Sequence, residues 1–159
     1  MSSQNLRLSG DETFISAHDI AARVQEMGDY FTTKYGDSEV VAITMMNGAK
    51  VFATDLTRSI QNINLLDDNM RVSSYNSDES SGSVSFHYDS SVQIKGKHVL
   101  LIEDILDTGT TLSHVIPQLW ERQPLSITIA CMFEKPSKRK KGTEFTVDDL
   151  QIGMRIDDK

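Results

Sequence analysis

The stretch VLLIEDILDTGTTL spans Val99–Leu112 and joins four aliphatic residues to an acidic, threonine-rich segment. The aliphatic start is typical of a buried parallel strand. Leu112 and further apolar residues follow at helical spacing, so we predict a helix over Thr111–Glu121, which Pro117 should kink or shorten. Between the two, Gly109 permits a tight turn, and the start of the helix offers free N–H groups and a favourable dipole. This junction therefore predicts a phosphate-binding loop, with hydroxyl donors from Thr108, Thr110 and Thr111.

Three carboxylates precede this loop, and they limit what it can bind. Glu103, Asp104 and Asp107 would repel a bare phosphate. They can instead accept hydrogen bonds from a sugar diol or hold a magnesium ion that bridges ligand oxygens. A phosphate cradle beside such carboxylates suits a ribose 5-phosphate group. The alternative is an acidic strand end followed by a helix cap, but the full arrangement favours a ligand site. No Gly-Lys-Ser/Thr ending is present, so the loop is not a Walker motif.

Length and charge limit the class of protein. The chain has 159 residues, close to one ordinary domain, and 16 basic against 23 acidic residues give a net charge of −7. This charge argues against nucleic acid as a partner, because no overall positive field attracts phosphates. Cys131 is the single cysteine, which excludes an internal disulfide and fits a reducing compartment. Met1–Gly10 has no secretory apolar region, and the run Val99–Ile102 is too short to span a membrane. We expect a cytoplasmic protein without membrane partners.

Helix and strand patterns alternate along the chain, which predicts an α/β fold. Its central, mainly parallel sheet should carry helices on both faces and bind ligands at the carboxyl ends of the strands. A capping-box start at Ser16 with Asp19 begins the first helix, and Gly36 ends it. A second helix is predicted over 49–60. The predicted strands are 40–45, 70–75, 83–88, 99–103, 125–133 and 150–154.

Three segments do not fit this alternation. Residues 1–13 are predicted as a flexible tail before a domain over 14–159. Ser73–Ser91 is rich in serine and is predicted to contain a mobile loop. Lys135–Lys141 (KPSKRKK) is a strongly basic run in an acidic chain. Such a run is usually a solvated turn, although it could also attract an anionic ligand.

Several of these segments together resemble the type I phosphoribosyltransferases, and among them the hypoxanthine-guanine (6-oxopurine) enzymes. Val99–Leu112 resembles the family's phosphoribosyl-pyrophosphate motif. Met46-Asn47-Gly48 stands at the position of its pyrophosphate loop, although many members carry lysine or arginine in place of Asn47. Ser74-Tyr75 matches a pair on the mobile lid loop, and Lys135–Arg139 matches a Lys-Pro-Ser-Arg segment. The resemblance implies the family's fold, with its mobile lid.

The resemblance also implies roles for single residues around the ribose phosphate. Glu103 and Asp104 are expected at the ribose hydroxyls and magnesium. Asp107 is expected to be the catalytic base that takes the proton of the purine imidazole ring. Together with Asp107, the residues Thr108, Gly109, Thr110 and Thr111 are expected to bind the 5′-phosphate.

Further roles implied by the resemblance concern pyrophosphate and the base. Met46, Asn47 and Gly48 are expected to bind pyrophosphate, with a cis peptide bond between the first two. Lys135 is expected to hydrogen-bond the oxygen at the purine 6-position. Arg139 is expected to contact pyrophosphate or to serve a structural role.

The implied activity is purine salvage. Hypoxanthine and/or guanine would react with phosphoribosyl pyrophosphate, with magnesium, to give the nucleoside monophosphate and pyrophosphate. A homodimer or homotetramer is expected. Family members continue beyond the position of Ile152–Lys159 into a base-stacking segment, which is expected to be missing here. A non-catalytic regulator that binds phosphoribosyl pyrophosphate or a nucleotide is therefore the alternative function.

Overall fold

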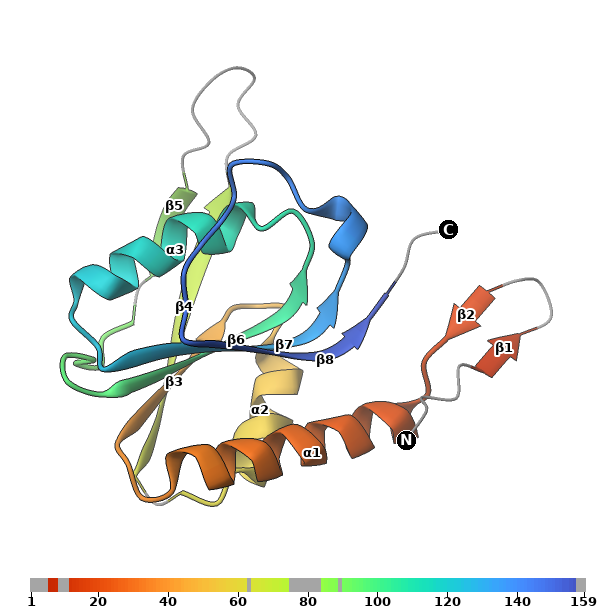
Figure 1. The fold of residues 1–159 in the computed structure, drawn as a ribbon, viewed down its shortest axis with the longest axis horizontal. Coiled ribbons are helices and arrows are strands. Elements are labelled where there is room, and N and C mark those ends of the chain that lie inside the picture. The colour runs from red at the N-terminus through yellow and green to blue at the C-terminus, as the bar shows by residue number, and fades with distance from the viewer. Residues whose placement is uncertain (1–5, 9–11, 63, 75–83, 89, 157–159) are drawn as a thin grey trace.

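The computed structural model describes residues 6–8, 12–62, 64–74, 84–88 and 90–156. Its centre is a six-stranded sheet with the order β5-β4-β3-β6-β7-β8, in which all neighbours are parallel except β4 and β5 (Figure 1). The fold is therefore the mainly parallel α/β arrangement that the sequence predicts. The strands of this sheet are β3 (Val40–Met45), β4 (Leu65–Ser74), β5 (Val84–Tyr88), β6 (His98–Leu106), β7 (Ser126–Glu134) and β8 (Asp149–Arg155).

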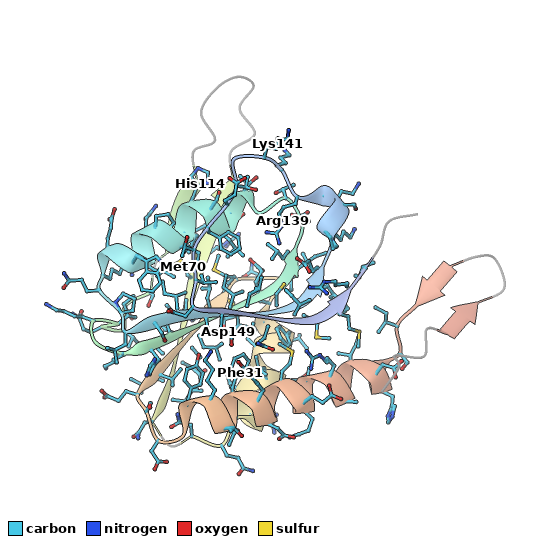
Figure 2. The ribbon with its side chains drawn as sticks, viewed as in Figure 1. Phe31, Met70, His114, Arg139, Lys141 and Asp149 are labelled. Atoms are coloured by element: carbon cyan, nitrogen blue, oxygen red, sulfur yellow. The ribbon has the colours of Figure 1, made fainter. Side chains whose placement is uncertain are left out.

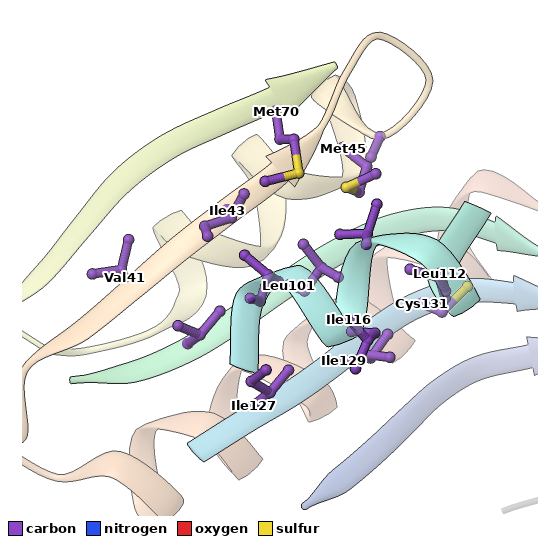
Figure 3. Packing of buried hydrophobic residues seen from close by; sticks show 14 of the residues in the cluster. Val41, Ile43, Met45, Met70, Leu101, Leu112, Ile116, Ile127, Ile129 and Cys131 are labelled. Atoms are coloured by element: carbon purple, nitrogen blue, oxygen red, sulfur yellow. The ribbon is translucent and has the colours of Figure 1, made fainter. Parts of the chain in front are cut away.

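Helices cover both faces of the sheet, as predicted. The helices α1 (Ala17–Tyr35) and α2 (Lys50–Ser59) lie on one face, and α3 (Thr110–Glu121) lies on the other (Figure 1). Side chains of a strand alternate between the two faces, so each central strand serves both cores. On β3, for example, Val41 and Ile43 pack toward α3 (Figure 3), whereas Val40 and Ala42 pack toward α1 and α2.

Local sequence signals define the ends of α1. The Ser16 hydroxyl accepts a hydrogen bond from the Asp19 amide at 3.0 Å, which satisfies one of the free N–H groups at the helix start. The helix ends at Gly36, whose φ of 53° is unfavourable for other residues. Between these caps Val24, Met27 and Phe31 are buried, and Figure 2 shows Phe31 pointing from the helix toward the sheet.

Two strands are longer than their predicted bounds of 70–75 and 99–103. β4 begins at Leu65, because residues 65–70 pair with β3 in parallel before the strand turns to β5. Its polar residues 67–69 hide this pairing from the sequence pattern, since they lie near the edge of the sheet and are not fully buried. β6 continues to Leu106 because residues 103, 105 and 106 still pair with β7. The acidic segment of β6 is thus strand and not loop.

Of the two effects predicted for Pro117 on the third helix, the shortening is wrong, and the kink stays a prediction. α3 runs through Pro117 to Glu121. The proline side chain is exposed, so its ring leaves the inward face of the helix undisturbed, where Ile116 and Leu119 stay buried.

At the N-terminal end, the strands β1 (Leu6–Leu8) and β2 (Glu12–Phe14) form a separate antiparallel pair. The flexibility of residues 1–13 stays a prediction. The helices in the described part of the chain are all too short or too polar to cross a lipid bilayer.

Asp68 on β4 holds the segment that returns from β5 to β6. One oxygen of its carboxylate accepts hydrogen bonds from the Ser90 hydroxyl and from the amides of Ser91 and Val92, at 2.7–2.8 Å. Although burial alone raises the pKa of this carboxyl group, these bonds outweigh that effect and lower the pKa below its ordinary value. These bonds therefore fix residues 90–92, which follow β5, to strand β4 of the sheet.

Close packing between α1 and α2 gives a first testable prediction. A Cβ atom on Gly28 would lie 2.0 Å from the Ser59 hydroxyl oxygen and 2.6 Å from its Cβ. Gly28→Ala should therefore lower the free energy of unfolding by about 1–3 kcal/mol, the usual range for overpacking. Urea denaturation of the ligand-free protein measures this change.

The variant Ser59→Gly serves as the control, because it removes the atoms that the new methyl group would meet. The double variant should be more stable than Gly28→Ala alone, despite the added glycine at the end of α2. If the changes in the free energy of unfolding from the two single substitutions add up in the double variant, the predicted clash between the helices does not exist.

Candidate functional site

The turn from β6 to α3 has the shape of an anion-binding loop. β6 ends at Leu106 and α3 begins at Thr110, with Gly109 as the N-cap at a φ of 82°. Only glycine adopts this left-handed conformation readily. Gly109 has no side chain to cap the helix, and the Thr108 hydroxyl accepts only a long hydrogen bond, 3.3 Å, from the Thr110 amide, so the helix start and its dipole can serve an anion. A cavity opens here, and its lining consists of Glu103 and the continuous run 105–112. The predicted phosphate-binding residues 107–111 thus line one cavity.

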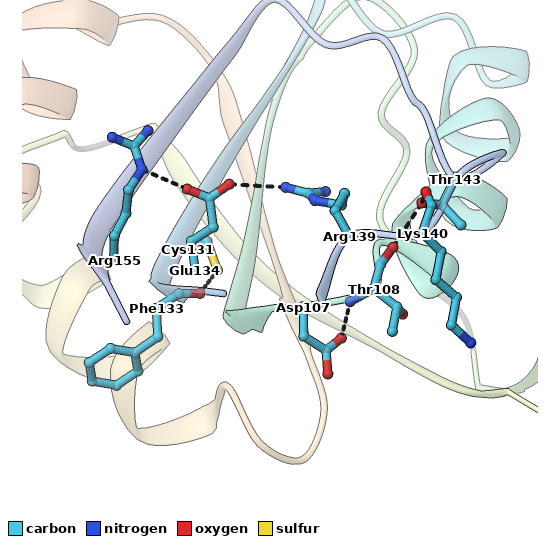
Figure 4. A network of polar contacts seen from close by, with 9 residues as sticks. All are labelled: Asp107, Thr108, Cys131, Phe133, Glu134, Arg139, Lys140, Thr143 and Arg155. Atoms are coloured by element: carbon cyan, nitrogen blue, oxygen red, sulfur yellow. Dashed lines mark hydrogen bonds and ion pairs between the residues drawn. The ribbon is translucent and has the colours of Figure 1, made fainter. Parts of the chain in front are cut away.

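A second segment, residues 139–143 in the connection between β7 and β8, packs against this turn and is called the supporting segment below. The carbonyl oxygen of Thr108 accepts hydrogen bonds from the Lys140 amide at 3.1 Å and from the Thr143 hydroxyl at 2.8 Å (Figure 4). Gly109 packs closely against the same segment, since a Cβ on it would lie 3.0 Å from the Thr143 hydroxyl and 3.1 Å from Nη1 of Arg139. The loop is therefore held in place by residues about 30 positions later in the chain.

The end of β6 brings the predicted carboxylates to the same place. Oε1 of Glu103 accepts a hydrogen bond from the Asp104 amide at 2.9 Å, and Oδ1 of Asp104 accepts one from the Ile105 amide at 2.7 Å. Burial, a side-chain hydrogen bond with Asp104 and the charges of Asp104 and Asp107 outweigh the opposite effect of the Asp104 amide and raise the pKa of Glu103 to about 8. With this pKa, Glu103 keeps its proton near neutral pH in the free protein, and a bound cation would favour its ionised form.

The loop at 46–48 lies against these carboxylates. The peptide bond between Met46 and Asn47 is cis, as the resemblance implies. A Cβ on Gly48 would lie only 2.4 Å from Oδ2 of Asp104, so glycine is required for this close approach. The Met46 amide also donates to the carbonyl of Met70 at 2.8 Å, which ties the loop to β4. The end of β3 and the end of β6 therefore form one site.

Of the residues predicted to bind the base or to lie on the lid, the structure describes Lys135 and Ser74 but not Tyr75. Lys135 follows β7 directly, and its amide donates to the carbonyl of Leu106 at 2.8 Å, which puts it beside the start of the phosphate loop. Its side chain is half-buried. Ser74 is the last residue of β4 and pairs with Val84 across to β5. Tyr75 lies outside the described residues.

The donor set at this site suits magnesium. Within the described ranges, no group of three or more His, Cys, Asp or Glu side chains forms a complete protein cage for a metal. Magnesium, however, is usually held by one or two carboxylates together with phosphate oxygens of the substrate and water. The adjacent carboxylates of Glu103 and Asp104 fit that pattern.

Sequence reasoning missed Thr143 on the supporting segment and two residues of the flanking strands, Glu134 on β7 and Arg155 on β8. Thr143 binds the Thr108 carbonyl, and Glu134 forms ion pairs with both Arg139 and Arg155 (Figure 4). None of these contacts has a local sequence signal, because the partners of Thr143 and Arg155 are far apart in the chain. Glu134 directly precedes a segment that the sequence singled out, the basic run 135–141.

The close packing of Gly109 against the supporting segment predicts that alanine destabilises the protein more at Gly109 than at Gly142. Gly109→Ala and Gly142→Ala both place alanine at a φ near +80°, which costs about 1–2 kcal/mol. A Cβ at Gly142 meets nothing within 4 Å, whereas a Cβ at Gly109 presses on Arg139 and Thr143. Gly109→Ala should therefore be the more destabilising by about 1 kcal/mol or more in urea denaturation. Equal losses would show that the segment does not press on the loop.

Comparison with known proteins gives a consistent result. The phosphoribosyl transferase domain family matches residues 16–153. A hypoxanthine-guanine phosphoribosyltransferase of Bacillus subtilis is 39% identical over 131 residues, which cover 82% of this chain and 72% of that protein. A hypoxanthine phosphoribosyltransferase of Salmonella typhimurium is also 39% identical, over 92% of this chain and 86% of its own length. A crystal structure of a hypoxanthine phosphoribosyltransferase from Staphylococcus aureus superposes with a TM-score of 0.84 at 33% identity, covering 94% of this chain and 79% of that one.

Proposed function

The chain belongs to the phosphoribosyl transferase domain family, and we propose that it is a purine salvage enzyme. It transfers the phosphoribosyl group of phosphoribosyl pyrophosphate to hypoxanthine and/or guanine. The products are the nucleoside monophosphate and pyrophosphate. One observation carries this proposal, namely the cavity that Glu103 and residues 105–112 form at the turn from β6 to α3. The relatives reported above are all named as transferases, which favours catalysis over a non-catalytic nucleotide-binding regulator.

In the proposed reaction, the loop at 108–111 binds the 5′-phosphate through its backbone N–H groups and threonine hydroxyls. The bond between C1′ of the ribose and pyrophosphate breaks, and a bond from C1′ to a purine ring nitrogen forms. Positive charge develops on the ribose, and the carboxylates of Glu103 and Asp104 stabilise it. Residues 46–48 face the departing pyrophosphate. The loop thus holds the substrate by its 5′-phosphate, while bonds break and form at C1′ of the ribose.

Two further side chains act on the purine. As one nitrogen of its imidazole ring attacks C1′, the carboxylate of Asp107 takes the proton from the other nitrogen. The ammonium of Lys135 donates to the oxygen at the 6-position, where an amino group would place two donors against each other. This pairing selects 6-oxopurines over adenine. Arg139 lies behind the phosphate loop and contributes positive charge there.

Magnesium is the proposed cofactor, with Glu103 and Asp104 as its protein ligands. When bound, it neutralises charge on the oxygens of the pyrophosphate group and so makes that group a better leaving group. A cytoplasmic location and assembly into a homodimer or homotetramer stay predictions. Light scattering after size-exclusion chromatography measures the assembly directly.

A competition assay tests the proposed function. The protein is incubated with magnesium, phosphoribosyl pyrophosphate and equal amounts of hypoxanthine, guanine, xanthine, adenine and orotate. Mass spectrometry then identifies the nucleotide formed. We expect inosine or guanosine monophosphate. Adenosine or orotidine monophosphate as the main product would contradict the role of Lys135, and binding of phosphoribosyl pyrophosphate without any product would favour the regulator.

Asp107→Asn tests the proposed base. Asparagine keeps an oxygen that can accept the hydrogen bond from the Thr108 amide, so the turn should persist. It cannot take up a proton, so kcat should fall about 10²–10⁴-fold. The KM for phosphoribosyl pyrophosphate should change far less. Steady-state kinetics measures both values.

Asp55→Asn on the exposed side of α2 is the matched control for the loss of one negative charge. It should leave kcat unchanged. A kcat of Asp107→Asn close to that of this control would rule out Asp107 as the catalytic base.

A further inference from the structure

Glu134, at the end of β7, is a charged residue in a buried position. It is only 8% exposed. Its Oε1 accepts from Nη2 of Arg139 at 3.1 Å, and its Oε2 accepts from Nε of Arg155 at 2.9 Å (Figure 4). Burial of a carboxylate is unfavourable unless it is paired, and these two contacts supply that pairing. Two guanidinium groups on one carboxylate leave one net positive charge at this point.

The two arginines differ in what else they touch. Arg139 also packs against the phosphate loop, since its Nη1 and Cδ lie 3.1 and 3.2 Å from the position that a Cβ on Gly109 would occupy. Its guanidinium stacks over the ring of Phe145 at 5.9 Å, which further restricts its position. Arg155 lies on the edge strand β8, its side chain is 71% exposed, and its ion pair with Glu134 is the interaction that fixes it. Of these two described arginines, Arg139 is the one that connects the buried carboxylate to the loop.

We propose that Glu134 is a positioning residue that holds Arg139 against Gly109 in the phosphate loop. With Arg139 in this place, the turn keeps its shape, and a positive charge lies beside an anion site that also holds the acidic side chains Glu103, Asp104 and Asp107. Glu134 itself does not touch the ligand. The proposal rests on the proposed function only for the identity of that ligand as a 5′-phosphate of ribose.

Ribose 5-phosphate is the probe that tests this role, because it carries the 5′-phosphate without pyrophosphate or a base. Isothermal titration gives its Kd for the unmodified chain and for Glu134→Gln, which keeps the shape of the side chain but not its charge. We expect the Kd to rise about tenfold, as is reasonable for loss of a charge-assisted contact. Arg155→Gln removes the other ion pair of the same carboxylate, and exposed Glu121→Gln repeats the change in net charge. Both should leave the Kd within about twofold.

A double-variant cycle separates positioning from general destabilisation. Arg139→Gln should raise the Kd for ribose 5-phosphate about as much as Glu134→Gln does. The variant with both substitutions should have a Kd no higher than that of Arg139→Gln alone. Additive effects, or an unchanged Kd in Glu134→Gln, would overturn the proposal. Should Glu134→Gln fail to fold, the contrast between Arg139→Gln and Arg155→Gln decides, since equal effects of the two also overturn it.

Failure of the proposed function can be distinguished from failure of the role proposed for Glu134. A chain that binds ribose 5-phosphate with this pattern but converts no purine is not the proposed transferase, yet it still supports the role of Glu134. A chain that transfers phosphoribosyl groups while Glu134→Gln changes neither the Kd for ribose 5-phosphate nor the KM for phosphoribosyl pyrophosphate refutes that role alone.

Discussion

The left-handed turn at Gly109 is the constraint on which the site depends. It lies between the end of β6 and the start of α3, and it places the first residues of the helix in the lining of the cavity. The Gly109 carbonyl still accepts from the Ser113 amide in α3, whereas the Thr108 carbonyl lies between strand and helix and needs partners from elsewhere. The Thr108 carbonyl has two such partners, the Lys140 amide and the Thr143 hydroxyl. The phosphate loop and the β7–β8 connection therefore form one structural unit.

Charge explains why this unit contains a basic segment in an acidic protein. The chain has a net charge of −7, and the end of β6 brings Glu103 and Asp104 to the site. An anionic substrate needs local positive potential to approach such a surface. The run 135–141 follows β7 and lies against the phosphate loop, and Figure 2 shows Arg139 and Lys141 on the α3 side of the sheet. Asp107 and Lys135 can then act on the purine beside that loop.

Much of the fold and the principal site could be predicted from the sequence, because both rest on local patterns. Buried strands such as Val40–Met45 read as aliphatic runs, and the glycine between threonines marks the turn. β4 was predicted too short because Asp67 and Asp68 lie near the sheet edge, where polar residues are tolerated. The partners of Thr108 and Glu134 could not be predicted, since Thr143 and Arg155 reach them only through the order of strands in the sheet.

A crystal structure with inosine monophosphate and magnesium tests the central claim most directly. The account predicts that the 5′-phosphate lies within hydrogen-bonding distance of the backbone amides of residues 108–111, with the ribose hydroxyls facing Glu103 and Asp104. The loop should keep its bonds to Lys140 and Thr143. A phosphate bound elsewhere on the protein, or a loop that releases the 140–143 segment to bind it, would contradict the account.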